Sequence, residues 1–164
     1  AVEPEIWYLD EPFSSLDPLI RGQMQEEFVR LQKLLNKTIV FITHDFLEAI
    51  RLADRIAIMK EGRVVQIGTP AEIVMKPAND YVAKFTKDVP RAKLIRAQDC
   101  MKINQFPDAT KGTFKVPADA TLDEIIKKLS EKKQECSVLS AEGKIIGHIS
   151  AETVIDALAE VDTK

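Results

Sequence analysis

Two adjacent carboxylates, Asp10 and Glu11, follow a short apolar run at Ile6–Leu9. Such a run is typical of a strand that is buried on both faces of a parallel sheet. Ligands of open α/β folds bind where the strands leave the sheet. One carboxylate at that place can hold Mg²⁺, directly or through its waters, while its neighbour polarises an attacking water. The alternative is an ordinary acidic turn exposed to solvent.

His44 follows a second apolar run, Thr38–Thr43, which predicts a central parallel strand. A lone histidine is more often structural than functional. The position of His44 at the end of a strand, like that of the acidic pair, favours a functional role instead. Asp45 and Glu48 form a capping-box pattern, so we expect Asp45 to cap the following helix rather than to act in catalysis.

The order of these motifs resembles a known family. Ile6–Asp17 (IWYLDEPFSSLD) resembles the Walker B strand and D-loop of an ABC-type transport ATPase, and Phe41–Asp45 (FITHD) resembles the segment that carries its switch histidine. The sequence contains no G-x-x-x-x-G-K-[ST] motif, no Gln-loop and no LSGGQ-like signature. The resemblance therefore implies the C-terminal part of a longer ATPase subunit, and we expect the chain as given to be inactive alone.

The same resemblance implies a role for each matching residue. Glu11 and His44 would be catalytic, Glu11 as the general base and His44 as the sensor of the γ-phosphate. A neutral His44 imidazole could hydrogen-bond a γ-phosphate oxygen or the attacking water. Asp10 would be the Mg²⁺ ligand. The residues that bind ATP would be Asp10, Ser15 and Asp17, and Asp17 would also signal across a homodimer with ATP between its two copies.

Composition narrows the possible partners. The 164 residues allow one ordinary domain or two small ones, and a net charge of −3 argues against a nucleic-acid partner. No apolar run approaches the roughly 18 residues of a membrane span, and no signal peptide opens the sequence. We therefore expect a cytoplasmic protein with free thiols at Cys100 and Cys136, because these two cysteines lack metal-ligand spacing.

Between the two motifs and after them, the spacing of apolar residues predicts several further elements. An amphipathic helix after Pro18 would pack its apolar residues on the sheet; these are Ile20, Met24, Phe28, Leu31 and Leu35. Arg55–Met59 and Arg63–Ile67 read as a hairpin, Thr69 as the cap of a helix in a capping box with Glu72, and Tyr81–Phe85 as a short helix.

The segment PANDYVAKFTKDVPRAKLIRAQDCM, residues 77–101, resembles the region that follows the ATPase core in importers of quaternary amines and compatible solutes. Those solutes include glycine betaine, proline and carnitine. The Pro-Phe pair at 12–13 agrees with an importer. The alternative is a linker that carries no information about the transported solute.

A second unit begins at Ala97. We expect a short helix at Asp99–Ile103, a loop at Gln105–Lys111, a strand at Phe114–Val116, a helix capped by Thr121 with Glu124 in box position, strands at Ser137–Ser140 and Lys144–Ile149, and a last helix capped by Ser150. This order, with GHIS before the last helix, resembles one CBS motif. A single CBS motif normally pairs with another, so the resemblance implies dimerisation.

Two features of this second unit have two readings. Ser150 and Thr153 stand where adenosine-binding CBS motifs carry Ser or Thr followed three residues later by Asp, so an adenine nucleotide there is doubtful and a structural dimer module is the alternative. Lys127, Lys128, Lys132 and Lys133 form either a solvated helix face or a contact with anionic lipid.

Taken together, the sequence predicts an α/β fold: the C-terminal part of a P-loop NTPase (ABC ATPase) with a parallel sheet and helices, followed by a small α+β CBS-type unit. The expected divisions are an ATPase part at 1–86, a linker at 87–96 and a CBS-type unit at 97–164. The predicted function is ATP hydrolysis, with ATP and Mg²⁺, that drives the uptake of glycine betaine or proline-type solutes. The alternative is a non-catalytic regulatory or dimerisation protein that retains an ATPase remnant.

As an importer subunit, the protein would form a homodimer and bind transmembrane permease subunits, with a substrate-binding protein as an indirect partner. The permease would hold it on the inner face of the cell membrane.

Overall fold

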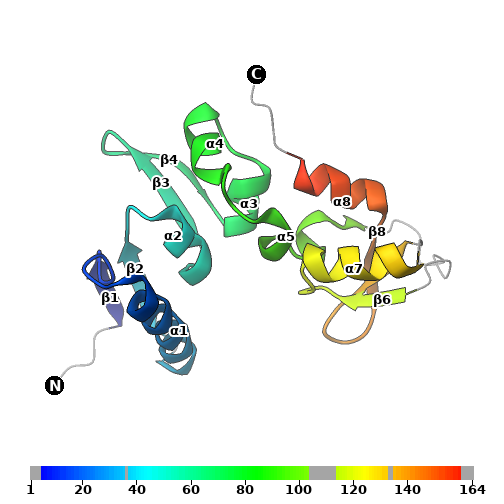
Figure 1. Ribbon diagram of the computed structural model, residues 1–164, viewed down its shortest axis with the longest axis horizontal. Coiled ribbons are helices and arrows are strands. Elements are labelled where there is room, and N and C mark those ends of the chain that lie inside the picture. Colours follow the sequence, from blue (N-terminus) through cyan, green and yellow to red (C-terminus); the bar gives the residue numbers. More distant parts are fainter. Residues whose placement is uncertain (1–4, 36, 104–113, 133–134, 160–164) are drawn as a thin grey trace. The chain divides into compact units, whose positions relative to one another are not determined.

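The structure is a computed structural model that describes residues 5–35, 37–103, 114–132 and 135–159. The chain forms two compact units, Ala1–Ile56 and Ala57–Lys164 (Figure 1). None of the helices in the described ranges combines the length and the apolar character needed to cross a membrane.

The first unit is built on two parallel strands, β1 (Ile6–Asp10) and β2 (Thr38–Ile42), joined by the helix α1 (Pro18–Leu35). The register pairs Ile6 with Thr38 and Asp10 with Ile42, so both strands end at the same edge. The helix α2 (Phe46–Leu52) follows β2. The parallel pairing and the helix between the strands confirm the predicted α/β arrangement.

Burial on both faces of these strands was a wrong expectation. Tyr8 is 71% exposed and Ile42 is 51% exposed. These strands form a sheet of only two strands in the described part of the chain, which leaves these side chains uncovered. The predicted apolar stripe of α1 is likewise mostly exposed, at 40–45%; this group comprises Ile20, Met24, Leu31 and Leu35.

An aromatic cluster forms the packed centre of the first unit. The ring of Phe13 lies 5.8 Å from that of Phe41 on β2 and 6.1 Å from that of Phe28 on α1, measured between centroids. The rings of Phe28 and Phe41 are 5.9 Å apart. Phe13 is only 6% exposed, so the turn after β1 is anchored against both α1 and β2.

The second unit starts with a hairpin of β3 (Ile56–Lys60, whose first residue closes the first unit) and β4 (Arg63–Gly68). Glu61 and Gly62 turn it, both with positive φ. The helices α3 (Pro70–Met75) and α4 (Asp80–Thr86) follow, as the sequence predicted. The expected capping box of Thr69 and Glu72 is present at the start of α3.

Two short helices, α5 (Arg91–Leu94) and α6 (Ala97–Cys100), lead into the C-terminal sheet. The sequence suggests residues 87–96 as a linker. These residues contain α5, and Ile95 among them is fully buried. The helix expected at Asp99–Ile103 is wrong in extent. The chain becomes extended at Met101, and β5 (Lys102–Ile103) pairs with the last strand of the sheet.

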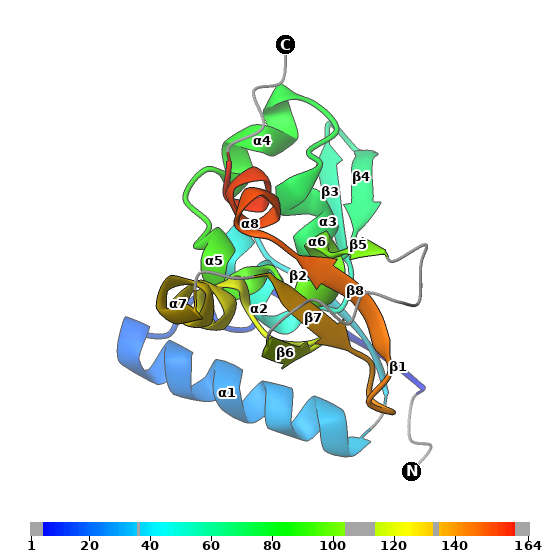
Figure 2. The same ribbon diagram turned by 90° about the vertical axis from the view of Figure 1, so that its right-hand side faces the viewer.

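The C-terminal sheet has the strand order β5-β8-β7-β6, visible in Figure 2. The strand β6 (Phe114–Pro117) is parallel to β7 (Cys136–Leu139), which is antiparallel to β8 (Ile145–Ile149). The helix α7 (Leu122–Lys132) joins β6 to β7, and α8 (Ala151–Leu158) follows β8. The strand–helix–strand–strand–helix order predicted for the part of the chain after Ala97 is confirmed by β6, α7, β7, β8 and α8.

The core around the C-terminal sheet is made of apolar residues from its strands and helices, and Ile95, Leu122, Ile125, Val138 and Ile149 are all fully buried. The capping box of Thr121 and Glu124 is present, and Ser150 caps α8 through Thr153 N. The expected loop at Gln105–Lys111 and the position of Lys133 lie outside the described residues.

Candidate functional site

The carboxyl ends of β1 and β2 bring the two predicted motifs together. The Glu11 amide donates to the Ile42 carbonyl at 2.9 Å, which extends the parallel ladder by one residue beyond Asp10. The φ of Glu11 is 47°, in the left-handed region that residues other than glycine rarely adopt. The Ser14 hydroxyl and amide donate to the Glu11 carbonyl at 2.9 and 3.2 Å and close the turn. This turn directs the Glu11 side chain toward the end of β2.

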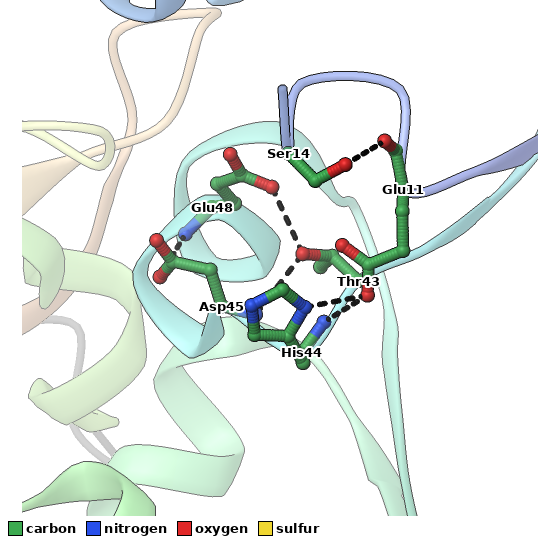
Figure 3. A network of polar contacts seen from close by, with 6 residues as sticks. All are labelled: Glu11, Ser14, Thr43, His44, Asp45 and Glu48. Atoms are coloured by element: carbon green, nitrogen blue, oxygen red, sulfur yellow. Dashed lines mark hydrogen bonds and ion pairs between the residues drawn. The ribbon is translucent and has the colours of Figure 1, made fainter. Parts of the chain in front are cut away.

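Glu11 and His44 are in direct contact (Figure 3). The Glu11 Oε1 atom lies 2.7 Å from His44 Nδ1 and accepts a hydrogen bond from the His44 amide at 2.9 Å. The Glu11 hydrogen bond and negative charge raise the pKa of His44 above its ordinary value. The His44 side chain is 81% exposed and that of Glu11 is 32% exposed, so the pair is open to a ligand.

The other predicted site residues lie around this pair. Asp10 is exposed at the last position of β1, next to Glu11. Ser15 is exposed in the turn that follows, and Asp17 Oδ1 accepts hydrogen bonds from Leu19 N and Ile20 N, both at 3.1 Å. Asp17 is therefore the N-cap of α1. Sequence reasoning had assigned it only to nucleotide binding and signalling.

A magnesium ion fits the chemistry of the acidic end of β1. Within the described residues, no group of three or more His, Cys, Asp or Glu side chains could enclose a metal ion. Mg²⁺ needs no such enclosure, because it keeps several waters and is usually held by one or two carboxylates together with substrate phosphates. The exposed carboxylate of Asp10 suits that kind of ligation.

A buried carboxylate lies behind the exposed pair. Glu48, on α2, is 7% exposed and accepts hydrogen bonds from Thr43 Oγ1 at 2.9 Å and from Gln25 Nε2 at 3.0 Å. The predicted capping box is half wrong. Asp45 does cap α2, but its amide donates to Thr43 Oγ1 at 3.0 Å instead of to Glu48. The Glu48 carboxylate instead accepts from Gln25 and from the Thr43 hydroxyl.

Sequence reasoning missed Gln25 and Arg51, which complete this network. Arg51 Nη1 donates to Gln25 Oε1 at 3.3 Å, and its Nη2 lies 2.9 Å from Glu26 Oε1. The sequence offers one weak signal for Gln25, which lies between Met24 and Phe28 and thus on the flank of an apolar stripe. That spacing predicts partial burial of an amide but not its partner.

The sequence of the chain is similar to those of many transport ATP-binding proteins, among them proteins of Pelagibacter ubique and Bacillus subtilis. The chain is 47% identical over 164 residues to the trimethylamine N-oxide transport system ATP-binding protein TmoW of Pelagibacter ubique, covering 100% of this chain and 48% of the relative. It is 43% identical over 156 residues to the glycine betaine/carnitine/choline transport ATP-binding protein OpuCA of Bacillus subtilis, covering 94% of this chain and 40% of the relative. No family model matches.

Among solved structures, cbiO1 from Clostridium perfringens, described as part of the ABC transporter complex cbiONQ, aligns with 54% of this chain and 34% of its own. The sequence identity is 34% and the TM-score is 0.41. A TM-score this low does not establish a shared fold, so the two sequence relatives carry the comparison. The chain spans about half the length of those relatives.

Proposed function

The chain belongs to the family of ABC transporter ATP-binding subunits, and we propose that the complete protein hydrolyses ATP to drive the import of quaternary amines or related small solutes. The observation that carries this proposal is the contact between Glu11 and His44 at the shared edge of β1 and β2. Asp10 beside them supplies the carboxylate for Mg²⁺.

The chemistry of the pair suits hydrolysis of a phosphoanhydride. The Glu11 carboxylate can accept a proton from an attacking water. Nδ1 of His44 contacts Glu11, which leaves Nε2 as the ring nitrogen available to a γ-phosphate oxygen. A neutral ring that donates through Nδ1 has only an acceptor at Nε2, whereas the imidazolium donates from both nitrogens. The raised pKa of His44 therefore favours the form that can hydrogen-bond a phosphate.

Asp10 and the turn after it complete the proposed site. Mg²⁺ held by Asp10 would neutralise charge on the phosphates and orient them. Ser15 and Asp17 lie in the turn that leads to α1, where they would contact nucleotide from the facing copy of a homodimer. The cap that Asp17 forms on α1 supports a rigid turn at this place.

The names of the relatives support the choice of solute class. One relative is named for trimethylamine N-oxide, and the other for glycine betaine, carnitine and choline. We propose a solute of this class, transmembrane permease subunits as partners, a substrate-binding protein as an indirect partner, and a peripheral position on the cytoplasmic face of the membrane. The proposed functional divisions are 1–86, 87–96 and 97–164.

For the C-terminal unit we propose a dimerisation role of the CBS type. Ser150 Oγ lies 3.1 Å from Thr153 Oγ1 and accepts a hydrogen bond from Thr153 N at 3.2 Å. Thr153 is 5% exposed. The Ser150 hydroxyl therefore caps α8, and the Thr153 hydroxyl is hydrogen-bonded to it, which supports a structural role for both over binding of an adenosine ribose.

The decisive experiment substitutes Glu11 in the complete protein. We expect Glu11→Gln to lower kcat by about 10²- to 10⁴-fold, the usual contribution of a general base, while ATP stays bound. A matched control is Glu27→Gln, which makes the same chemical change on the outer part of α1 and should leave kcat unaltered. Wild-type turnover in Glu11→Gln would refute the assignment of the base. Uptake of labelled glycine betaine, choline and trimethylamine N-oxide into vesicles that hold the permease would test the solute class.

A further inference from the structure

We propose that Glu48 is a positioning residue that holds the His44 segment in place for ATP hydrolysis, an inference that rests on the function proposed above. Glu48 is buried, and its side-chain hydrogen bonds reach neither Glu11 nor the His44 ring (Figure 3). Its two carboxylate oxygens instead accept hydrogen bonds from two different elements: Thr43 at the end of β2 and Gln25 on α1.

The contacts of Glu48 fix both neighbours of His44. The Thr43 hydroxyl donates to Glu48 Oε2 at 2.9 Å and accepts from the Asp45 amide at 3.0 Å. Asp45 in turn accepts from Leu47 N at 2.9 Å and caps α2. His44 therefore stands between two residues whose side chains are locked, while its own ring remains exposed beside Glu11. A buried carboxylate without its donors is costly, so this geometry is strongly favoured.

The network continues from Glu48 into α1. An arginine can only donate hydrogen bonds, so the contact of Arg51 with Gln25 assigns Oε1 of Gln25 to Arg51 and its Nε2 to Glu48. Gln25 is 5% exposed, which leaves its amide little freedom to turn. The helix that carries Gln25 begins at the cap formed by Asp17. Glu48 thus joins the segment of His44 to the helix that follows the D-loop turn.

The first test is kinetic and uses the complete protein. We expect Glu48→Gln to lower kcat by about 10- to 100-fold, a typical loss for a displaced catalytic group, with the KM for ATP changed less than about threefold. The reason is that the side-chain amide at position 48 has only one oxygen, so its NH₂ group must face one of the two donors, the Thr43 hydroxyl or the Gln25 amide, and that hydrogen bond is lost. Glu27→Gln is the matched control on an exposed carboxylate. A wild-type kcat in Glu48→Gln would overturn the proposal.

A double variant tests whether the hydrogen bonds themselves matter. In Gln25→Glu/Glu48→Gln, the amide at position 48 can donate to the carboxylate at position 25 and accept from the Thr43 hydroxyl. The carboxylate at position 25 then faces Arg51. Every donor regains an acceptor, so we expect kcat to recover to within about fivefold of the wild type. Recovery of thermal stability without recovery of kcat would overturn the positioning role, because it would leave only a structural one.

Two further measurements keep the inference separate from the proposed function. The NMR chemical shift of the His44 backbone amide, recorded without ATP, should change in Glu48→Gln and return in the double variant; an unaltered shift would refute positioning even if ATP hydrolysis is confirmed. Absence of ATP hydrolysis by the complete wild-type protein would instead refute the proposed function alone. If Glu48→Gln does not fold, Thr43→Val removes the Thr43–Glu48 hydrogen bond, together with the acceptor of the Asp45 amide, with little change in volume, and it should show the same selective loss of kcat.

Discussion

Asp17 offers a quantitative test of the turn that leads from the site into α1. Its Oδ1 accepts the amide hydrogens of Leu19 and Ile20, the second and third residues of the helix. Loss of an N-cap oxygen typically costs about 1 kcal/mol, and a carboxylate at a helix N-terminus contributes a further 0.3–1 kcal/mol, approximately. We therefore expect Asp17→Ala to lower the free energy of unfolding by about 1–2 kcal/mol. Asp17→Asn keeps the oxygen and loses only the charge, so it should lower the free energy of unfolding by about 0.3–1 kcal/mol.

Urea denaturation followed by far-UV circular dichroism measures this difference. With a slope of about 2 kcal/mol per M of urea, a loss of 1 kcal/mol lowers the midpoint by about 0.5 M. The reasoning is refuted if Asp17→Ala and Asp17→Asn lower the midpoint equally, or if neither does. The ATPase rate of the complete protein then separates capping from signalling. If the charge of Asp17 signals across the dimer, Asp17→Asn should lose activity while it keeps most of its stability.

Three other predictions follow from the same structure. Glu11 raises the pKa of His44, so their contact stabilises the fold below about pH 6.5, and this stabilisation is lost as the pH rises through the raised pKa of His44. An NMR titration of the histidines should therefore give a lower pKa for His44 in Glu11→Gln than in the wild type. An equal pKa in the two proteins would contradict the pairing. Burial raises the pKa of the Cys100 and Cys136 thiols to about 11. A disulfide reagent should therefore label both thiols slowly at pH 8, and faster only in urea or near pH 11. Rapid labelling of the folded chain at pH 8 would contradict the raised pKa values. Glu61 has a φ of 50° in the β3–β4 turn, so Glu61→Asn should raise the stability by up to about 1 kcal/mol, and a lower melting temperature would be the contrary result.

The position of Glu11 and His44 at one edge of the sheet could be predicted from the sequence because it depends on strand direction. Their hydrogen bond also depends on the turn with positive φ at Glu11, which the sequence did not indicate. The two apolar runs are separated by one helix, which makes a parallel pair, and parallel strands end at the same edge of a sheet. The caps at Thr69, Thr121 and Ser150 were predictable for a similar reason. Each depends on residues within one turn of the same helix, where spacing in the sequence fixes distance in space.

Burial of the strands was not predictable in the same way. An apolar run such as Ile6–Leu9 indicates that burial of these side chains is favourable, but it does not indicate which part of the chain covers them. Tyr8 and Ile42 are exposed in the described ranges even though their types and their neighbours favour a buried strand. The strands of the C-terminal sheet are buried where β1 and β2 are not, because β6, β7 and β8 pack with helices close in sequence, among whose residues Leu122 and Ile125 are fully buried.

The misassigned role of Glu48 has a different physical cause. The sequence places two acceptors, the Thr43 hydroxyl and the Glu48 carboxylate, within reach of one donor, the Asp45 amide, and local spacing favours Glu48. The outcome is decided by Gln25, a buried amide that lies 23 residues before Glu48 and requires an acceptor of its own. Because Glu48 satisfies Gln25, the Asp45 amide goes to Thr43, and one carboxylate comes to bind both the strand before His44 and the helix after the D-loop. A local motif thus predicts the elements around this site, and a buried partner distant in sequence determines how they are held together.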